Sequence, residues 1–82
     1  NAKKLKVTVE VENIDNTIII LGTTKWLNQI ESISANKINF NLEQSEIPVL
    51  NKFLVENGIL VNALVPIRSL EDYFLTITSG AK

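Results

Sequence analysis

The chain has no cysteine, no histidine and no methionine among its 82 residues. Without cysteine it forms no disulfides and no thiolate metal sites. Small secreted domains often depend on disulfides, so the cytoplasm is the favoured compartment. Without histidine it also lacks the commonest general base and the commonest metal ligand. We therefore expect no metal site and no catalytic residues in this chain.

Strong net charge and long apolar runs are also missing. The formal net charge is −1, which provides no electrostatic footprint for a nucleic acid. The longest apolar candidate, residues 18–21, stops at Gly22, far short of the roughly 20 residues that a membrane-spanning helix needs. We therefore expect no nucleic-acid partner and no direct insertion into a membrane.

Glycine is scarce, and its placement bears on nucleotide binding. None of Gly22, Gly58 and Gly80 begins the G-x-x-x-x-G-K-[ST] pattern whose backbone amides cradle phosphates. The two neighbouring carboxylates Glu71 and Asp72 lie where a helix is expected to begin, a position where acidic groups favour the helix dipole. We expect no cofactor in this chain.

Alternating apolar and polar residues predict strands. Valines and Leu5 alternate with polar residues over 5–11, and Ile38, Phe40 and Leu42 do the same over 37–43. Ile33 lies between two serines just upstream, and Ala35-Asn36 fits a tight hairpin turn, with Asn36 tolerating a positive φ.

A helix and a final strand follow. Ser45 is the predicted N-cap, Pro48 lies in the first turn, and Gly58 stands where a left-handed residue ends a helix. Residues 59–65 predict a strand with Val61, Ala63 and Val65 on one face and Leu60, Asn62 and Leu64 on the other. Pro66 is expected to stop it.

Residues 14–30 permit two interpretations. Ile19, Thr23, Trp26, Leu27 and Ile30 fit one helical stripe that Asp15 would cap. The β-branched run over 17–21 and Gly22 favour instead a strand over 17–21 followed by a short helix over 24–30. Trp26 is expected in the core in preference to an interface, because it shares its stripe with Ile30.

With a helix in that segment, the order strand, helix, hairpin, helix, strand predicts an α+β fold. A βαββαβ chain forms a ferredoxin-like two-layer sandwich, in which a four-stranded antiparallel sheet carries both helices on one face. One domain over residues 3–79 is expected, with an extra short helix at its C-terminal end. The predicted core consists of Leu5, Val7, Val9, Val11, Ile33, Ile38, Phe40 and Leu42 beneath Trp26, Ile30, Ile47, Leu50 and Leu54.

The end of the chain carries the most specific pattern. Residues 65–78 read VPIRSLEDYFLTIT, in which Ser69 caps a short helix whose apolar stripe is Leu70, Phe74 and Ile77. A helix this short is not stable alone in water, so we expect the stripe to pack near Leu60 and Leu64. The candidate interface residues are Arg68, Leu70, Tyr73, Phe74 and Ile77.

The order Ser-Leu-Glu-Asp-aromatic-Phe-Leu-x-x-Thr over 69–78 resembles the C-terminal tail of ATP-binding subunits of bacterial ABC transporters. The family pattern also has a helix in the position of residues 14–30, which favours that interpretation. The resemblance implies a non-catalytic accessory or regulatory domain whose ATPase domain, with its ATP and Mg²⁺, lies elsewhere in a longer parent protein. The implied partners are that ATPase domain, the transporter's membrane subunit and a second copy of the domain. The implied location is cytoplasmic, peripheral to the inner membrane.

The ends of the chain fit that interpretation. The lack of methionine suggests a piece of a longer protein, and Asn1-Ala2 has the appearance of an expression-tag remnant. The alternative is a free-standing ferredoxin-like module for ligand sensing or dimerisation, similar to amino-acid-sensing regulatory domains.

Overall fold

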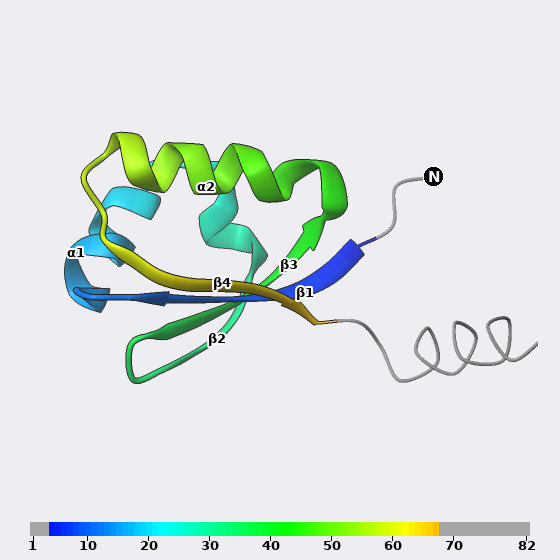
Figure 1. Cartoon of the computed structure of the whole chain (residues 1–82), viewed down its shortest axis with the longest axis horizontal. Helices are drawn as coiled ribbons and strands as arrows, with labels where there is room; N and C mark the ends of the chain where they lie inside the picture. Colours follow the sequence, from blue (N-terminus) through cyan, green and yellow to red (C-terminus); the bar gives the residue numbers. More distant parts are fainter. Residues whose placement is uncertain (1–3, 68–82) are drawn as a thin grey trace, which may run out of the picture.

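The computed structural model describes residues 4–67 (Figure 1). Its elements are β1 (Lys4–Val11), α1 (Ile14–Leu21), η1 (Lys25–Gln29), β2 (Ile30–Ser34), β3 (Lys37–Glu43), η2 (Gln44–Glu46), α2 (Ile47–Glu56) and β4 (Val61–Ile67). The helix predicted from Leu70 to about Thr78 lies outside the described residues. Within them the expected α+β class is confirmed.

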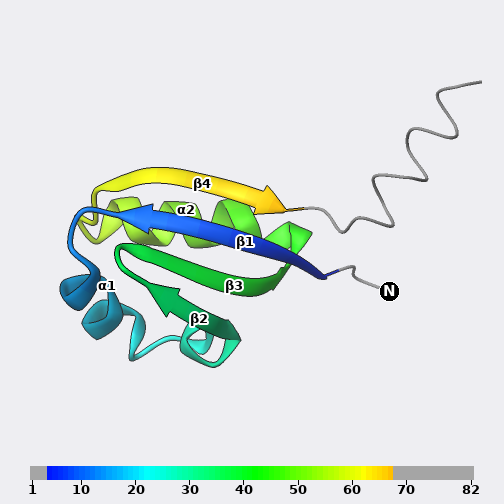
Figure 2. The ribbon, with the colours of Figure 1, turned by 90° about the horizontal axis from the view of Figure 1, so that it is seen from below.

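The four strands form one antiparallel sheet in the order β2-β3-β1-β4, which Figure 2 shows from below. β1 and β3 are central, and β2 and β4 are the edges. The helices α1 and α2 lie over the same face of this sheet (Figure 1). No helix within residues 4–67 covers the opposite face, which we call the open face.

The β2–β3 hairpin turns at the predicted Ala35-Asn36 step. The positive φ is at Ala35, at 53°, and not at Asn36 as we expected. An alanine in this conformation carries a steric cost that asparagine or glycine would avoid.

Residues 17–21 are helical, so the strand predicted there in the alternative is wrong, but the helix ends at Leu21, and a separate short helix follows at 25–29, close to the 24–30 of that alternative. Gly22 terminates α1, and the Thr24 hydroxyl then caps the separate 3₁₀ helix η1 by accepting from the Trp26 amide at 3.3 Å. The predicted cap at Asp15 is also wrong. Asn13 caps α1, because its Oδ1 accepts a hydrogen bond from the Asn16 amide at 2.9 Å.

Helix α2 begins one turn earlier as η2, so Ser45 lies inside the 3₁₀ turn and is not the N-cap. Pro48 does occupy the first turn, as predicted. The helix ends in a Schellman motif: Gly58 has φ +77°, and the Ile59 and Gly58 amides donate to Leu54 O at 3.0 Å and Val55 O at 3.1 Å.

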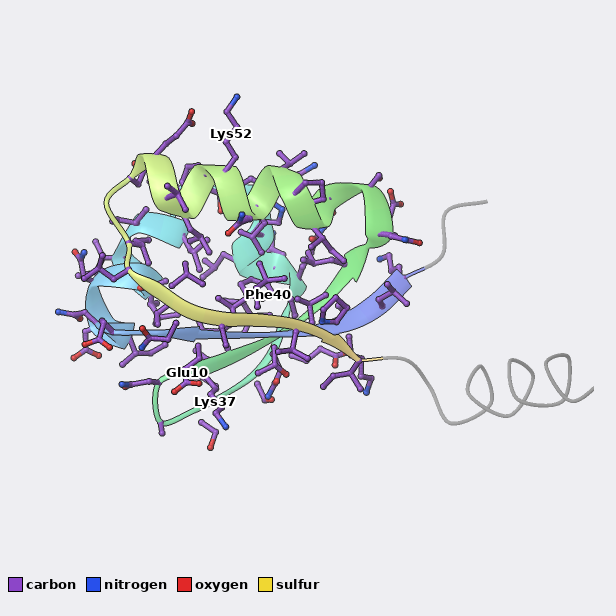
Figure 3. The ribbon with its side chains drawn as sticks, in the orientation of Figure 1. Glu10, Lys37, Phe40 and Lys52 are labelled. Carbon is purple, nitrogen blue, oxygen red and sulfur yellow. The ribbon has the colours of Figure 1, made fainter. Side chains whose placement is uncertain are left out.

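The core lies between the sheet and the helices, where Figure 3 shows Phe40. Its buried members are Val7, Val9, Val11, Leu21, Trp26, Ile38, Phe40, Leu42, Leu50, Leu54 and Ile59. Leu5, Ile30 and Ile47 are only partly buried at its border. Leu21 and Ile59 were not predicted.

Ile33 was predicted in the core and Ile19 in the apolar stripe of residues 14–30, but both are exposed. Ile33 is 48% exposed, because β2 is an edge strand that the helices do not cover. Ile19 is 73% exposed, because α1 buries Thr17 and Leu21 instead. Trp26 is in the core as expected, with its ring 5.2 Å from that of Phe53.

Candidate interaction surface

Over β1, β3 and β2 the open face of the sheet is polar, and some of its side chains hydrogen-bond to one another. The Thr8 hydroxyl donates to Asn39 Oδ1 at 2.7 Å, and Asn39 Nδ2 donates to Ser32 Oγ at 2.9 Å, so one chain of hydrogen bonds crosses three strands. Glu10 and Lys37 are opposite each other in the β1–β3 register and project from this face (Figure 3). Such a surface is well suited to contact with water.

The edge strand β4 has a different character. Residues 58–67 contain no charged side chain. Leu60, Val65 and Ile67 are nevertheless 69%, 51% and 49% exposed. Val65 and Ile67 lie opposite Thr8 and Lys6 on the open face, whereas Leu60 and the 60% exposed Val55 line a groove at the start of β4. We call these three residues, with Val55, the β4 surface.

The side chains of β4 do not alternate between the two faces of the sheet as predicted. A register shift opposite Glu10 and Val11 interrupts it. Val61 and Leu64 therefore pack against the core from the helix side, opposite Val11 and Val9. Ala63 and Val65 are opposite Glu10 and Thr8, and so belong to the open face.

An open groove of about 500 Å³ runs along β4 beside α2. It is lined by Asn51, Val55, Gly58, Ile59, Leu60, Val61, Asn62, Ala63 and Leu64. Asn62 donates from Nδ2 to Glu12 Oε2 at 2.7 Å, so that side chain already has a partner. The groove thus offers apolar contact and little polar specificity.

The Schellman turn places this groove. The left-handed Gly58 reverses the chain after α2, and the buried Ile59 anchors the turn in the core. The Glu12 amide then donates to Leu60 O at 3.0 Å, which attaches the start of β4 to the end of β1. Leu60 is left at the surface as a consequence.

Pro66 does not stop the strand, because β4 continues to Ile67. On an edge strand a proline is accommodated where its nitrogen faces away from the neighbouring strand. The prediction is therefore corrected, and the β4 surface extends to the last described residue.

The segment Leu21-Gly22-Thr23-Thr24-Lys25 has a structural role. The Thr24 hydroxyl donates to Leu21 O at 2.8 Å, and Lys25 forms an ion pair with Glu46.

Within residues 4–67, no three side chains among His, Cys, Asp and Glu are grouped so that they could hold a metal ion. No helix in this part of the chain is long and apolar enough to cross a membrane.

The predicted interface residues Arg68, Leu70, Tyr73, Phe74 and Ile77 lie outside the described residues. The structure places the β4 surface immediately before them. The sequence did contain a signal for it, since both faces of residues 59–65 are apolar. The sequence pattern did not show that β4 is an edge strand, which is what leaves Val65 and Ile67 exposed.

Comparison with protein-family models, with curated proteins and with solved structures found no match for this chain. The assignment of function therefore depends on the residues and their geometry.

Proposed function

We propose that this chain is a non-catalytic interaction domain belonging to the ATP-binding subunit of a bacterial ABC transporter. The observation that carries the proposal is the β4 surface. The uncharged segment 58–67, in which Leu60, Val65 and Ile67 are exposed, is followed in the sequence by residues 69–78, which resemble the tail of those subunits. An exposed apolar strand edge just before that segment in the sequence suits contact with another protein domain.

We also assign the domain to the ferredoxin-like class. The order βαββαβ, the strand order β4-β1-β3-β2 and the helices on one face support that assignment. The class hosts many functions, so the fold alone does not select one.

In this proposal the chemistry belongs to a separate ATPase domain, which binds ATP and Mg²⁺ and drives transport. The present domain contacts that ATPase domain, and through the complex it is associated with the transporter's membrane subunit. It lies on the cytoplasmic side, peripheral to the inner membrane, and modulates the ATPase cycle.

The coding sequence upstream of residue 3 tests the transporter assignment directly. We expect it to encode a P-loop, G-x-x-x-x-G-K-[ST], and the ABC signature motif. An upstream reading frame without either would overturn the assignment.

Titration with Mg-ATP tests the proposal that nucleotide binding belongs to the ATPase domain and not to this chain. The chain has no P-loop and no histidine, so calorimetry on the 82-residue protein is expected to give no binding heat, and no phosphate release is expected. Binding with a Kd of about 1 μM, equivalent to about −8 kcal/mol, would show that this domain holds nucleotide itself.

The open groove favours a second candidate, a free-standing module for ligand sensing or dimerisation. Its volume of about 500 Å³ is within the range of small-molecule sites. Calorimetric titration with the twenty amino acids tests this alternative. Binding heat from one of them, together with an upstream sequence that lacks the P-loop, would support it.

A further inference from the structure

We propose that two copies of this chain join through β4, antiparallel and across a two-fold axis, to form one continuous eight-stranded sheet. The inference deepens the proposed interaction function and rests on the β4 surface, not on the transporter assignment.

The two edges of the sheet differ in how they discourage strand addition. Natural edge strands are protected by charge, shortness, proline or bulges. β2 has five residues, carries Glu31 and is irregular between Ile30 and Ser32. β4 has seven residues and no charge, and its register shift and Pro66 lie toward its two ends. Among the described residues, the stretch from Ala63 to Val65 is therefore regular and pairs with no strand other than β1.

The hydrogen bonds of β1 show which backbone groups of β4 face the free edge. The Val11 amide donates to Asn36 O at 2.9 Å, on the β3 side, whereas the Glu12 amide donates to Leu60 O, on the β4 side. Amides alternate along a strand, so those of Thr8 and Glu10 also face β4.

Thr8 and Glu10 are opposite Val65 and Ala63, whose backbone groups accordingly face β1. It follows that the N–H and C=O of Leu64 point outward. The C=O of Pro66 also points outward, but Pro66 has no N–H to donate to a partner strand, so pairing at this edge centres on Leu64.

A second copy is the occupant that this edge fits best. A two-fold interface brings the same patch of both molecules together, so it must be self-complementary. An uncharged strand meets this condition, because no like charges oppose each other. With the axis at Leu64, the two Leu64 residues exchange both backbone hydrogen bonds, and Ala63 lies beside the partner's Val65 on the open face.

Sedimentation equilibrium tests the dimer with a matched pair of variants. Val65→Lys and Ile33→Lys each place one lysine at an apolar, half-exposed position on an edge strand, β4 and β2 respectively. Wild type and Ile33→Lys are expected to reach about twice the monomer mass of 9.2 kDa. Because a short strand pairing buries little surface, we expect weak association, and the measurement therefore extends to about 500 μM protein.

Val65→Lys is expected to weaken association by about tenfold or more, since an edge lysine opposes strand pairing. Circular dichroism and urea unfolding of both variants establish that each is folded. A monomeric wild type at about 500 μM, or a Val65→Lys variant that associates as wild type does, overturns the proposal.

Two other outcomes assign the edge differently and also overturn the proposal. If Ile33→Lys alone abolishes association, β2 is the interface. If wild type is monomeric but Phe74→Asp dimerises, the C-terminal segment of the same chain occupies the β4 edge. An upstream sequence without a P-loop removes the transporter assignment and leaves the dimer standing, so the two failures are distinguishable.

Discussion

At the scale of single residues, Phe40 has the largest side chain among the fully buried residues. It lies on the central strand β3, opposite Val7 of β1, and points toward the helices (Figure 3). Phe40→Ala would leave a cavity that the surrounding sheet and helix cannot close. We expect it to lower the free energy of unfolding by about 3–5 kcal/mol, measured by urea denaturation.

Ile33→Ala is the control for that measurement. Ile33 is on β2, opposite Ile38, but is about half exposed, so its truncation is expected to cost less than about 1 kcal/mol. Equal losses in the free energy of unfolding for the two variants would contradict the placement of Phe40 in the core and Ile33 at its edge. The difference also explains why sequence alone misplaced Ile33: alternation identifies the face of a strand, not its distance from the sheet edge.

At the scale of secondary-structure elements, the Schellman turn after α2 determines where β4 begins. Gly58 has φ +77°, and a Cβ added there would meet no atom within 4 Å. Gly58→Ala therefore tests backbone conformation without a steric clash. We expect a loss of about 1–2 kcal/mol in the free energy of unfolding.

Gly58→Asn is the companion variant, since asparagine adopts the left-handed conformation more readily than alanine. Its free energy of unfolding is expected to fall by less than that of Gly58→Ala. The two variants should have similar m-values in urea. An alanine variant as stable as wild type would show that this turn tolerates another conformation.

The elements differ in how well sequence predicted them. The strands at 5–11 and 37–43 were clear because one face of each is buried and the other is open to water. Residues 14–30 were ambiguous because local preferences conflict. The β-branched Thr17 is accommodated in α1 by donating to Asn13 O at 2.7 Å, while Gly22 ends the helix. Neither feature can be inferred from the spacing of the apolar residues.

At the scale of the whole molecule, the sheet has a stable centre and two unequal edges. β1 pairs with both β3 and β4, and the valines of β1 and the apolar residues of β3 are fully buried. Amides in these strands should open only with global unfolding, whereas the edges open more readily. The β4 surface is thus supported by the most stable part of the fold.

Hydrogen exchange followed by NMR can separate the two edges residue by residue. The amides of Leu64 on β4 and Ile33 on β2 both face outward, since their neighbours Val65 and Ser32 face inward toward β1 and β3. In dilute protein both should exchange quickly, while Val65 and Ser32 are protected by the ladder.

Raising the protein concentration should slow exchange at Leu64 by about tenfold or more, because strand pairing gives its amide an acceptor and stabilises the paired state by mass action. Ile33 should be unaffected over the same range. In Val65→Lys the concentration dependence at Leu64 should disappear while protection in β1 and β3 persists. Slowing at Ile33 instead would place the contact on the β2 edge. Protection of Leu64 that does not vary with concentration would indicate that the edge is covered within a single chain.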